Sequence, residues 1–494
     1  MKKTTKVICL TLAAIMFLVP LSACKSSSSI TTESSYSIFD GDDVTTTAGT
    51  TGNTGSTGST GKTGNTGSNG NGGGSGSNTK LEKKYENLDL KGATISMAAP
   101  WKIEPGKSGT STVATLQRKR IAELEKKYNC KFKWVVYGNE FSERLRTSVA
   151  ANKPVYDFVI LYTSAIPGYA YNGYLQNLDK IDAIDVTNNK WNLGAVSNGA
   201  FNGGHYTFNI GSAVPRYVLT FNKTLFDKNK WGDPYQLYYN GKWTWDELIK
   251  IAQKATDKNA GRYGIGGIEL ATSSIIASYG GSVISMDSKG KPTFTGDSAE
   301  CSQAISLICD LKNKYKDYVW SPESYTWTTA INGLAEGKVA MAVTQMYMIR
   351  ENILDMEDDY GIVPMPKGSN SKGRYASVQN DIPTWTMLAN NPLAQEKAYV
   401  LNLYTEPYKG YEDIISKAEL ETYCRDNDSV KILLDVEKNY GLFDYSTWFS
   451  NAGSVYSSAI DSVISGTATF SEAMGKNKSK IVQSMNDTYK AWQE

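Results

Sequence analysis

Between residues 91 and 161, short apolar runs alternate with segments whose apolar residues recur at helical spacing. The apolar runs predict strands at Lys91–Pro100, Cys130–Tyr137 and Asp157–Leu161. Spacings of three and four residues predict helices at Thr112–Tyr128 and Phe141–Ala151. Strand, helix, strand, helix, strand is typical of a parallel α/β sheet. Ligands of such sheets bind at the carboxyl ends of the strands, so the segments that follow these strands are candidates for a site.

The rest of the chain continues the mixture of strands and helices. Val214–Phe221 and Val339–Thr344 are predicted strands. Capping signals predict helices that begin with the box Thr244–Glu247, with Asp297 and Glu300, and with Asn391–Pro392. A further short helix is expected at Ala330–Glu336, and the last ninety residues are expected to be mainly helical.

The N-terminus has the order of features found in a secreted lipoprotein. Lys2, Lys3 and Lys6 precede the apolar run Val7–Val19, which is too short for a comfortable membrane span. The sequence Leu-Ser-Ala-Cys that ends at Cys24 resembles the bacterial lipobox, in which this Cys is acylated. We therefore expect a signal peptide at 1–23 and a lipid anchor on Cys24, on the extracellular face of the cell membrane. The alternative is an ordinary signal peptide with an unrelated Cys.

A polar, low-complexity segment separates this anchor from the rest of the chain. Of the 36 residues Val44–Thr79, 33 are Gly, Ser, Thr or Asn, and none is Pro. Such a composition is typical of a flexible linker, which we place at 24–82. About 410 residues then remain to fold, more than one core usually supports, so two lobes are expected.

The composition excludes several classes of function. The 52 Lys and Arg residues nearly balance the 50 Asp and Glu residues, which argues against nucleic acid as a partner. His205 is the only histidine, so a site with several His ligands is impossible. Cys301 and Cys309 lie eight residues apart in a helical pattern, too far for a disulfide. The 31 Tyr and 11 Trp residues can build a core or offer flat surfaces to a ligand.

Several segments together resemble the extracellular solute-binding proteins of ABC importers, in the sugar-binding group that includes the maltose-binding proteins. The order and spacing of these segments carry the resemblance over about residues 88–494. They are Ile121–Tyr128, Asp157–Leu161 with Gly168–Leu175, Phe221–Lys223 with Leu225–Phe226, Trp243–Leu248, Glu336–Met341 and Tyr360–Gly368.

The resemblance implies a two-lobed periplasmic-binding-protein-like fold of type II, in which hinge strands join two α/β domains. Lobe one is then expected at 88–214 and 376–410, and lobe two at 215–375 and 411–494. The ligand would lie between the lobes, and the closed form would dock on the ABC permease subunits in the membrane.

The resemblance also indicates ligand-binding residues, several of which could instead have a purely structural role. Trp101 and Lys102 follow the first strand, although Trp101 could simply cap the sheet edge. Tyr162 and Ser164 follow the third strand, where maltose-binding relatives carry an Asp-Arg pair; Ser164 and Ala165 stand at those positions here, which weakens a maltose assignment. Tyr347 aligns with a Trp that stacks on sugar, or it packs in the core. Trp448 matches another stacking region, and Asn380 with Asp381 could bind hydroxyl groups or form a solvated turn.

Other aromatic and polar residues are weaker candidates. Trp327, Tyr279 and Arg216 are possible contacts, whereas Trp243 and Trp245 flank a helix start and are expected to be structural. His205 is expected in an exposed turn. The turn Asp257–Gly261 lacks the extra carboxylates that a Ca²⁺ site needs, and we predict no metal, no cofactor and no catalytic residue.

The sequence thus predicts a monomeric, non-catalytic binding lipoprotein that captures a carbohydrate, with an oligosaccharide favoured, for an ABC importer. Aromatic rings stack on the apolar face of a sugar, while amide and carboxylate groups bind its hydroxyls. The alternatives are a sensory or co-receptor lipoprotein with the same fold, a binder of a non-sugar solute, and an enzyme that acts on polysaccharide.

Overall fold

The computed structural model describes residues 75–188, 190–191, 193–209, 215–287, 289–368, 375, 378–438 and 442–494. The predicted signal peptide, Cys24 and most of the predicted linker lie outside these residues. The end of the expected linker is a correction, because α1 (Ser75–Lys84) is helical. Leu81 of this helix packs against the apolar core that contains Ile95 and Phe158. Tyr85, directly after the helix, stacks on Tyr399 with ring centroids 4.4 Å apart, so the helix is attached to the folded body.

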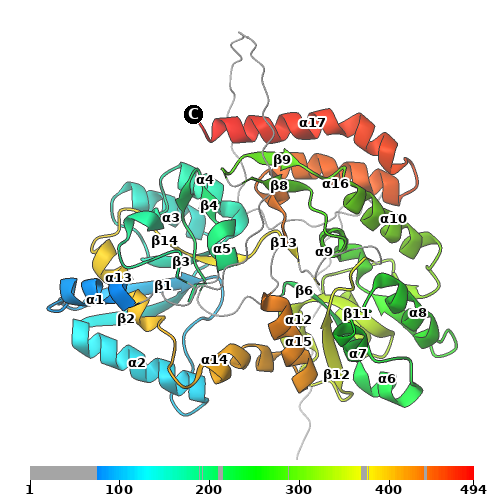
Figure 1. Cartoon of the computed structure of the whole chain (residues 1–494), viewed down its shortest axis with the longest axis horizontal. Coiled ribbons are helices and arrows are strands. Elements are labelled where there is room, and N and C mark those ends of the chain that lie inside the picture. Colours follow the sequence, from blue (N-terminus) through cyan, green and yellow to red (C-terminus); the bar gives the residue numbers. More distant parts are fainter. Residues whose placement is uncertain are drawn as a thin grey trace, which may run out of the picture.

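Lobe one, as we use the term, is built on a four-stranded sheet (Figure 1). Its order is β14 (Pro383–Met387), β3 (Phe158–Tyr162), β1 (Ala93–Ala99) and β2 (Cys130–Val136). β1 runs parallel to β2 and β3, and β14 runs antiparallel to β3. The helices of this lobe are α2 (Thr112–Tyr128), α3 (Phe141–Ala150), α4 (Ile166–Tyr171), α5 (Leu193–Asn198) and α13 (Ala394–Tyr404).

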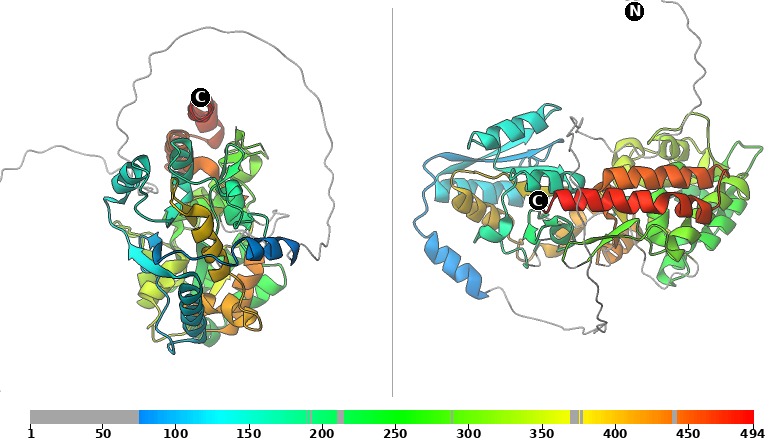
Figure 2. Two further views of the ribbon diagram at one scale, coloured as in Figure 1. Left: turned by 90° about the vertical axis from the view of Figure 1, so that its left-hand side faces the viewer. Right: turned by 90° about the horizontal axis from the view of Figure 1, so that it is seen from above.

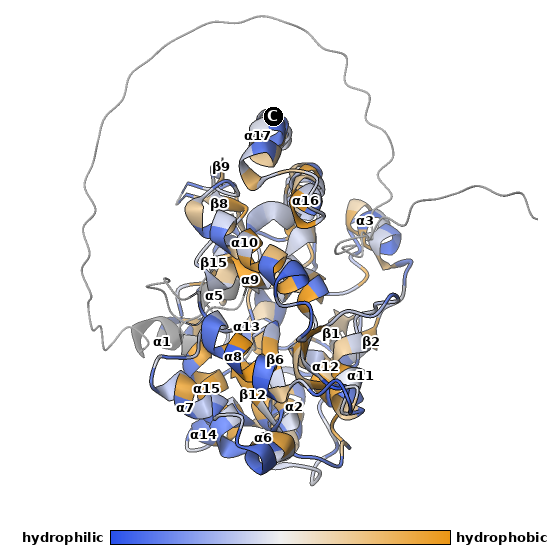
Figure 3. Cartoon of the chain, turned by 90° about the vertical axis from the view of Figure 1, so that its right-hand side faces the viewer, coloured by the Kyte–Doolittle hydropathy of each residue, from blue (hydrophilic) through white to orange (hydrophobic). Residues whose placement is uncertain are grey.

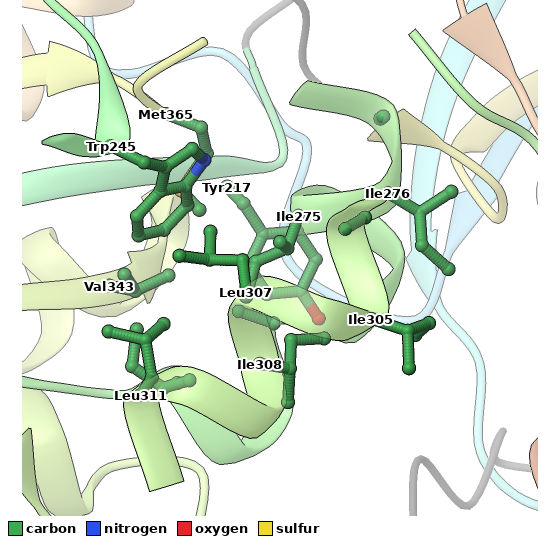
Figure 4. Packing of buried hydrophobic residues seen from close by; sticks show 14 of the residues in the cluster. Tyr217, Trp245, Ile275, Ile276, Ile305, Leu307, Ile308, Leu311, Val343 and Met365 are labelled. Atoms are coloured by element: carbon green, nitrogen blue, oxygen red, sulfur yellow. The ribbon is translucent and has the colours of Figure 1, made fainter. Parts of the chain in front are cut away.

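Lobe two is built on a five-stranded mixed sheet. Its order is β10 (Val319–Trp320), β7 (Tyr263–Gly266), β11 (Val339–Gln345), β6 (Tyr217–Asn222) and β12 (Tyr360–Pro364). Every residue of β11 and β6 is buried, as expected for central strands covered on both faces. In Figure 4, Trp245, Val343 and Met365 face the apolar side chains of two helices, Ile275 with Ile276 and Leu307 with Leu311.

Thirteen further elements surround the lobe-two sheet or join the lobes. The helices are α6 (Lys223–Asn229), α7 (Pro234–Tyr239), α8 (Trp245–Ala255), α9 (Thr272–Ser278), α10 (Ala299–Asn313), α11 (Thr329–Ala335), α12 (Met346–Asn352), α14 (Glu412–Ala418), α15 (Asn427–Lys438), α16 (Ser450–Ile464) and α17 (Phe470–Ala491). The hairpin β8 (Ile284–Met286) and β9 (Pro292–Phe294) completes them.

Two small pairings and five 3₁₀ turns complete the described chain. β4 (Ala200–Phe201) pairs with β5 (Gly204–His205), and β13 (Val378–Gln379) pairs with β15 (Leu442–Phe443). The 3₁₀ turns are η1 (Thr163–Ala165), η2 (Leu178–Lys180), η3 (Ile268–Leu270), η4 (Leu420–Thr422) and η5 (Tyr445–Thr447).

Helix starts differ from the predictions where a neighbouring residue makes the cap. α10 begins after Ser298, whose hydroxyl accepts the amide of Cys301, while Asp297 forms an ion pair with Lys478. α13 begins at Ala394, beyond the predicted Asn391–Pro392. The Thr244 side chain caps α8, but the Glu247 carboxylate accepts a hydrogen bond from Lys250 and does not form the second bond of the predicted capping box. Both bonds of a capping box are present at the start of α17, between Thr469 and Glu472.

The two aromatic residues at the start of α8 are packed as predicted. Trp243 and Trp245 are fully buried. The indole nitrogen of Trp243 donates to the carbonyl of Pro364, and that of Trp245 donates to the hydroxyl of Ser278. Their structural role is therefore confirmed.

The outer surface of the molecule is formed by helices with polar outer faces. Figure 3 shows hydrophobic colours on the strands β6 and β12 and hydrophilic colours on the outer sides of helices such as α6. α16 and α17 lie side by side along lobe two (Figure 2). Within the described part of the chain, no helix is both long and apolar enough to serve as a membrane span.

Candidate ligand site between the sheet edges

Four chain segments from the two sheets meet at one place. Tyr162 ends β3, and Asn380 with Asp381 comes shortly before β14, so these residues belong to lobe one. Arg216 directly precedes β6, and Tyr347 lies in the first turn of α12 directly after β11. Because β6 runs antiparallel to β11, its beginning and the end of β11 share one edge of the lobe-two sheet.

Hydrogen bonds join these segments across the lobes. Nη1 of Arg216 donates to Oδ1 of Asn380 at 2.8 Å and to the carbonyl of Asp381 at 3.0 Å. Oδ1 of Asp381 accepts the backbone amide of Ser164 at 3.0 Å. A side chain of lobe two is thus linked to the loop after β3 through residues 380 and 381.

Burial favours the uncharged forms of two titratable side chains in this network. Burial raises the pKa of Asp381, against the opposing effects of the Ser164 amide and the Arg216 guanidinium. Burial also raises the pKa of Tyr162, where the Asp381 charge adds to the increase and the Arg216 charge opposes it. These mutual effects place Tyr162, Asp381 and Arg216 in one electrostatic neighbourhood. The site therefore offers a phenol, an amide and a partly desolvated carboxyl group for hydrogen bonds.

Three large aromatic side chains at these sheet ends are exposed to solvent. Tyr162 is 38% exposed, Tyr347 is 44% exposed and Trp101 is 41% exposed. The amide of Met346 donates to the carbonyl of Arg216 at 3.0 Å, which places Tyr347 one residue from the network. Exposed flat rings beside polar groups can stack on a ligand.

Trp101 and Lys102 lie at the same edge of the lobe-one sheet as Tyr162. β1 and β3 run parallel in register, with Met97 opposite Phe158, so their carboxyl ends point the same way. Both Trp101 and Lys102 are exposed. They share this end of the lobe-one sheet with Tyr162.

Trp448 is a correction, because the structure buries its ring. It is 4% exposed, and the rings that surround it are Phe201, Phe443, Tyr445 and Trp492. A ring packed among these neighbours is not open to a sugar. The preceding residue reaches the site instead, since the Thr447 hydroxyl donates to the carbonyl of Asn380.

Asn380 is held firmly rather than solvated. It is 4% exposed, Arg216 bonds its side chain and Thr447 bonds its carbonyl. The alternative of a solvated turn is therefore wrong for Asn380. Sequence reasoning ranked Arg216 low and missed Thr447. The position of Arg216 directly before a predicted strand was the signal that could have raised its rank.

Two other residues that the sequence singled out, His205 and Asp257, bond neighbours of their own. His205 sits in the hairpin β4–β5, half-buried, with Nδ1 2.8 Å from Oδ1 of Asp179. The carboxylate of Asp257 accepts the amides of Asn259 and Ala260 and thereby closes its own turn. Among the residues that the structure describes, no group of three His, Cys, Asp or Glu side chains could hold a metal ion.

A family model for bacterial extracellular solute-binding proteins matches residues 106–400, more than half of the chain. The chain belongs to this family. The match spans Tyr162, Arg216, Tyr347 and Asp381, so the network lies within the part that defines the solute-binding protein. Comparison with curated protein sequences gives no significant match.

Solved structures show that this solute-binding protein has the two-lobed fold of its family. The cyclic alpha-maltosyl-1,6-maltose binding protein of Arthrobacter globiformis is 16% identical, with a TM-score of 0.59 over 80% of this chain and 99% of the other. The galacto-N-biose-/lacto-N-biose I-binding protein of Bifidobacterium longum is also 16% identical, with a TM-score of 0.58 over 82% and 99%. UgpB of Mycobacterium tuberculosis, solved with glycerophosphocholine, is 16% identical, with a TM-score of 0.53 over 80% and 99%.

Proposed function

We propose that this solute-binding protein captures a carbohydrate, with an oligosaccharide favoured, between its lobes and delivers it to an ABC permease. One observation carries the proposal: the exposed rings of Tyr162 and Tyr347 lie beside a polar network that links both lobes. A pyranose has an apolar CH face for such rings and a rim of hydroxyls for such polar groups. Trp101, Lys102, Tyr162, Ser164, Tyr347, Asn380 and Asp381 are the proposed ligand residues.

The charge distribution of the site supports a neutral ligand. The guanidinium of Arg216 already donates to Asn380 and Asp381, and burial disfavours the ionised form of Asp381. A cationic ligand would therefore find little opposite charge in the network. The sugar-binding proteins with the same fold support this choice, whereas the glycerophosphocholine complex of UgpB supports the alternative of a non-sugar solute.

The proposal includes no chemical step. The family is one of solute-binding proteins. In the network the Arg216 guanidinium donates to the Asn380 amide oxygen, and the Asp381 carboxylate accepts the Ser164 backbone amide, which is not the arrangement of a nucleophile beside a base. Ligand contacts to both lobes would favour a closed conformation, and that conformation would dock on the permease.

The membrane location follows from the sequence signals at the N-terminus. We propose that a lipid on Cys24 holds the protein, as a monomer, at the extracellular face of the cell membrane. The linker then lets the binding lobes sample the space above the membrane. A sensory or co-receptor role would use the same anchor, and deletion of the gene followed by sugar-uptake measurements separates it from import.

The decisive experiment is a thermal-shift screen against mono- and oligosaccharides, with glycerophosphocholine and a peptide mixture as non-sugar arms. A specific ligand at 100 times its Kd adds about 2.7 kcal/mol to the free energy of unfolding and raises Tm. A shift with sugars that is smaller in Tyr347→Ala than in the wild type supports the proposal. A shift only in a non-sugar arm, or chromatographic evidence of a cleaved glycan, contradicts it.

A further inference from the structure

A second connection between the lobes lies outside the network of the candidate site. Its lobe-one part is the hairpin β4–β5, whose turn residues Asn202 and Gly203 have φ values of 47° and 75°. Two successive left-handed residues make the tight turn that Asn-Gly favours in hairpins. The base of the hairpin is fixed to lobe one, because both the amide and Nδ1 of His205 bond the carboxylate of Asp179.

The tip of this hairpin is bound to the C-terminal end of lobe two. Nδ2 of Asn202 donates to the carbonyl of Trp492 at 2.8 Å, and Nε2 of Gln493 donates to Oδ1 of Asn202 at 2.7 Å. Phe201 is 5% exposed and meets the ring of Trp492 edge-on with centroids 5.4 Å apart. In Figures 1 and 2 the C-terminal end of α17 accordingly reaches over lobe one. We call Phe201, Asn202, Trp448, Trp492 and Gln493 the clasp.

The clasp leads directly to the candidate site. Trp448 contacts both Phe201 and Trp492, with centroids 6.4 and 6.5 Å away. Its neighbour Thr447 donates to the carbonyl of Asn380, whose side chain accepts from Arg216. The turn η5, which carries Thr447, is held in place because the buried carboxylate of Asp444 accepts the backbone amides of Ser446 and Val283. A displacement of Trp448 would therefore be transmitted to Asn380.

We propose that Asn202, Trp492 and Gln493 are positioning residues of the ligand site: they hold Trp448 and Thr447 so that Asn380 and Arg216 keep their places. None of the three is proposed to touch ligand. The inference rests on the proposed location of the site but not on the identity of the ligand. Residues near the C-terminus thereby help to fix the positions of Asn380 and Arg216 in the ligand site.

Hydrogen–deuterium exchange of the ligand-free full-length protein tests this directly. Asn202→Gly removes both side-chain bonds while keeping a residue that tolerates φ of 47°. The matched control is Asn152→Gly, another exposed left-handed Asn, with φ of 55°, at the end of α3. We expect exchange in segments 380–384 and 445–450 to become about fivefold faster in Asn202→Gly and to stay unchanged in the control.

The outcomes separate positioning from local stability. Faster exchange confined to 198–206 and 488–494, with the site segments unchanged, overturns the proposal. A second variant, Gln493→Ala, removes one hydrogen bond without changing the turn. It should also speed exchange in segments 380–384 and 445–450, but by less than Asn202→Gly does. Failure of both variants to alter the site segments also overturns it, whatever ligand the screen identifies.

Discussion

Tyr347 presents the most exposed aromatic ring beside the candidate network, on its lobe-two side. If the ring stacks on a sugar, Tyr347→Ala should weaken binding by about 5- to 150-fold, since stacking of a flat ligand on an aromatic side chain is worth about 1–3 kcal/mol. Tyr347→Phe keeps the ring and should retain most of the affinity. Calorimetric titration with the ligand found in the screen measures both.

Tyr239→Ala is the matched control, because Tyr239 is 48% exposed on α7. It should leave the affinity unchanged. Equal affinities for wild type and Tyr347→Ala would remove Tyr347 from the site and weaken the stacking model.

Asp381 gives the site a defined pH dependence of stability. An aspartate in an unfolded chain has a pKa of about 3.9, and burial raises the pKa of Asp381 in the folded protein. Between these two values the folded state binds more protons, so the contribution of Asp381 to the free energy of unfolding falls as pH rises through that window and is constant above it.

Asp381→Asn removes this dependence while keeping an oxygen that can accept the Ser164 amide. The variant should gain stability relative to wild type as pH rises from about 4 to 8, measured by urea unfolding at several pH values. The exposed Asp413→Asn should show no comparable trend. A variant that instead loses stability relative to wild type as pH rises would contradict the assigned role of burial.

Sequence reasoning named most members of the network but misjudged those whose environment is set at long range. Tyr162, Ser164 and Tyr347 follow strands, and strand ends are visible in a local pattern. The partners of Arg216 lie 164 and 165 residues away along the chain, so its role depended on tertiary structure. Trp448 failed for the same reason, since Phe201 and Trp492 bury it from distant segments.

Among the elements, long periodic segments were predictable and short paired ones were not. The helix predicted at Thr112–Tyr128 is α2 with the same bounds, because Ser111 caps it and Asn129 ends it in a left-handed conformation. β4, β5, β13 and β15 each have two residues, too few to show a period. Their pairing comes from turns and tertiary contacts, which a sequence pattern does not contain.

The turn after β7 shows how closely one element constrains another. Gly267 has φ of 94°, and a Cβ atom there would overlap the carbonyl oxygen of Val343 in β11. Gly267→Ala should therefore lower the free energy of unfolding by at least about 3 kcal/mol, through strain and displacement of a central strand. Gly241 has φ of 65° with open space around it, so Gly241→Ala should cost only about 1 kcal/mol.

Urea unfolding of the two glycine variants measures the difference between them. Because both positions need a left-handed backbone, the excess in Gly267→Ala reports the overlap with β11 alone. Equal losses in the two variants would mean that the loop relaxes away from the strand.

At the scale of the whole molecule, the discontinuous arrangement of the lobes could not be worked out from periodicity. β14 follows all five strands of the lobe-two sheet in sequence yet pairs with β3 in the lobe-one sheet. Only the resemblance to a known family predicted such a return, and the family match together with the two sheets shows the two-lobed fold. Local sequence patterns predict which segments are strands, but which strands pair with each other depends on packing across the whole chain.

The proposed anchor makes the final prediction at this scale. If Cys24 carries the lipid, the wild-type protein should sediment with membranes and enter the detergent phase on phase separation, because dual acylation supplies stable attachment. Cys24→Ala should appear in the aqueous phase and in the culture supernatant, since the remaining signal peptide still directs export. Cys9→Ala is the matched control, because Cys9 lies within the apolar run that cleavage removes, and this variant should remain in the detergent phase. Retention of Cys24→Ala in the detergent phase would instead show that the protein is held at the membrane by a feature other than this cysteine.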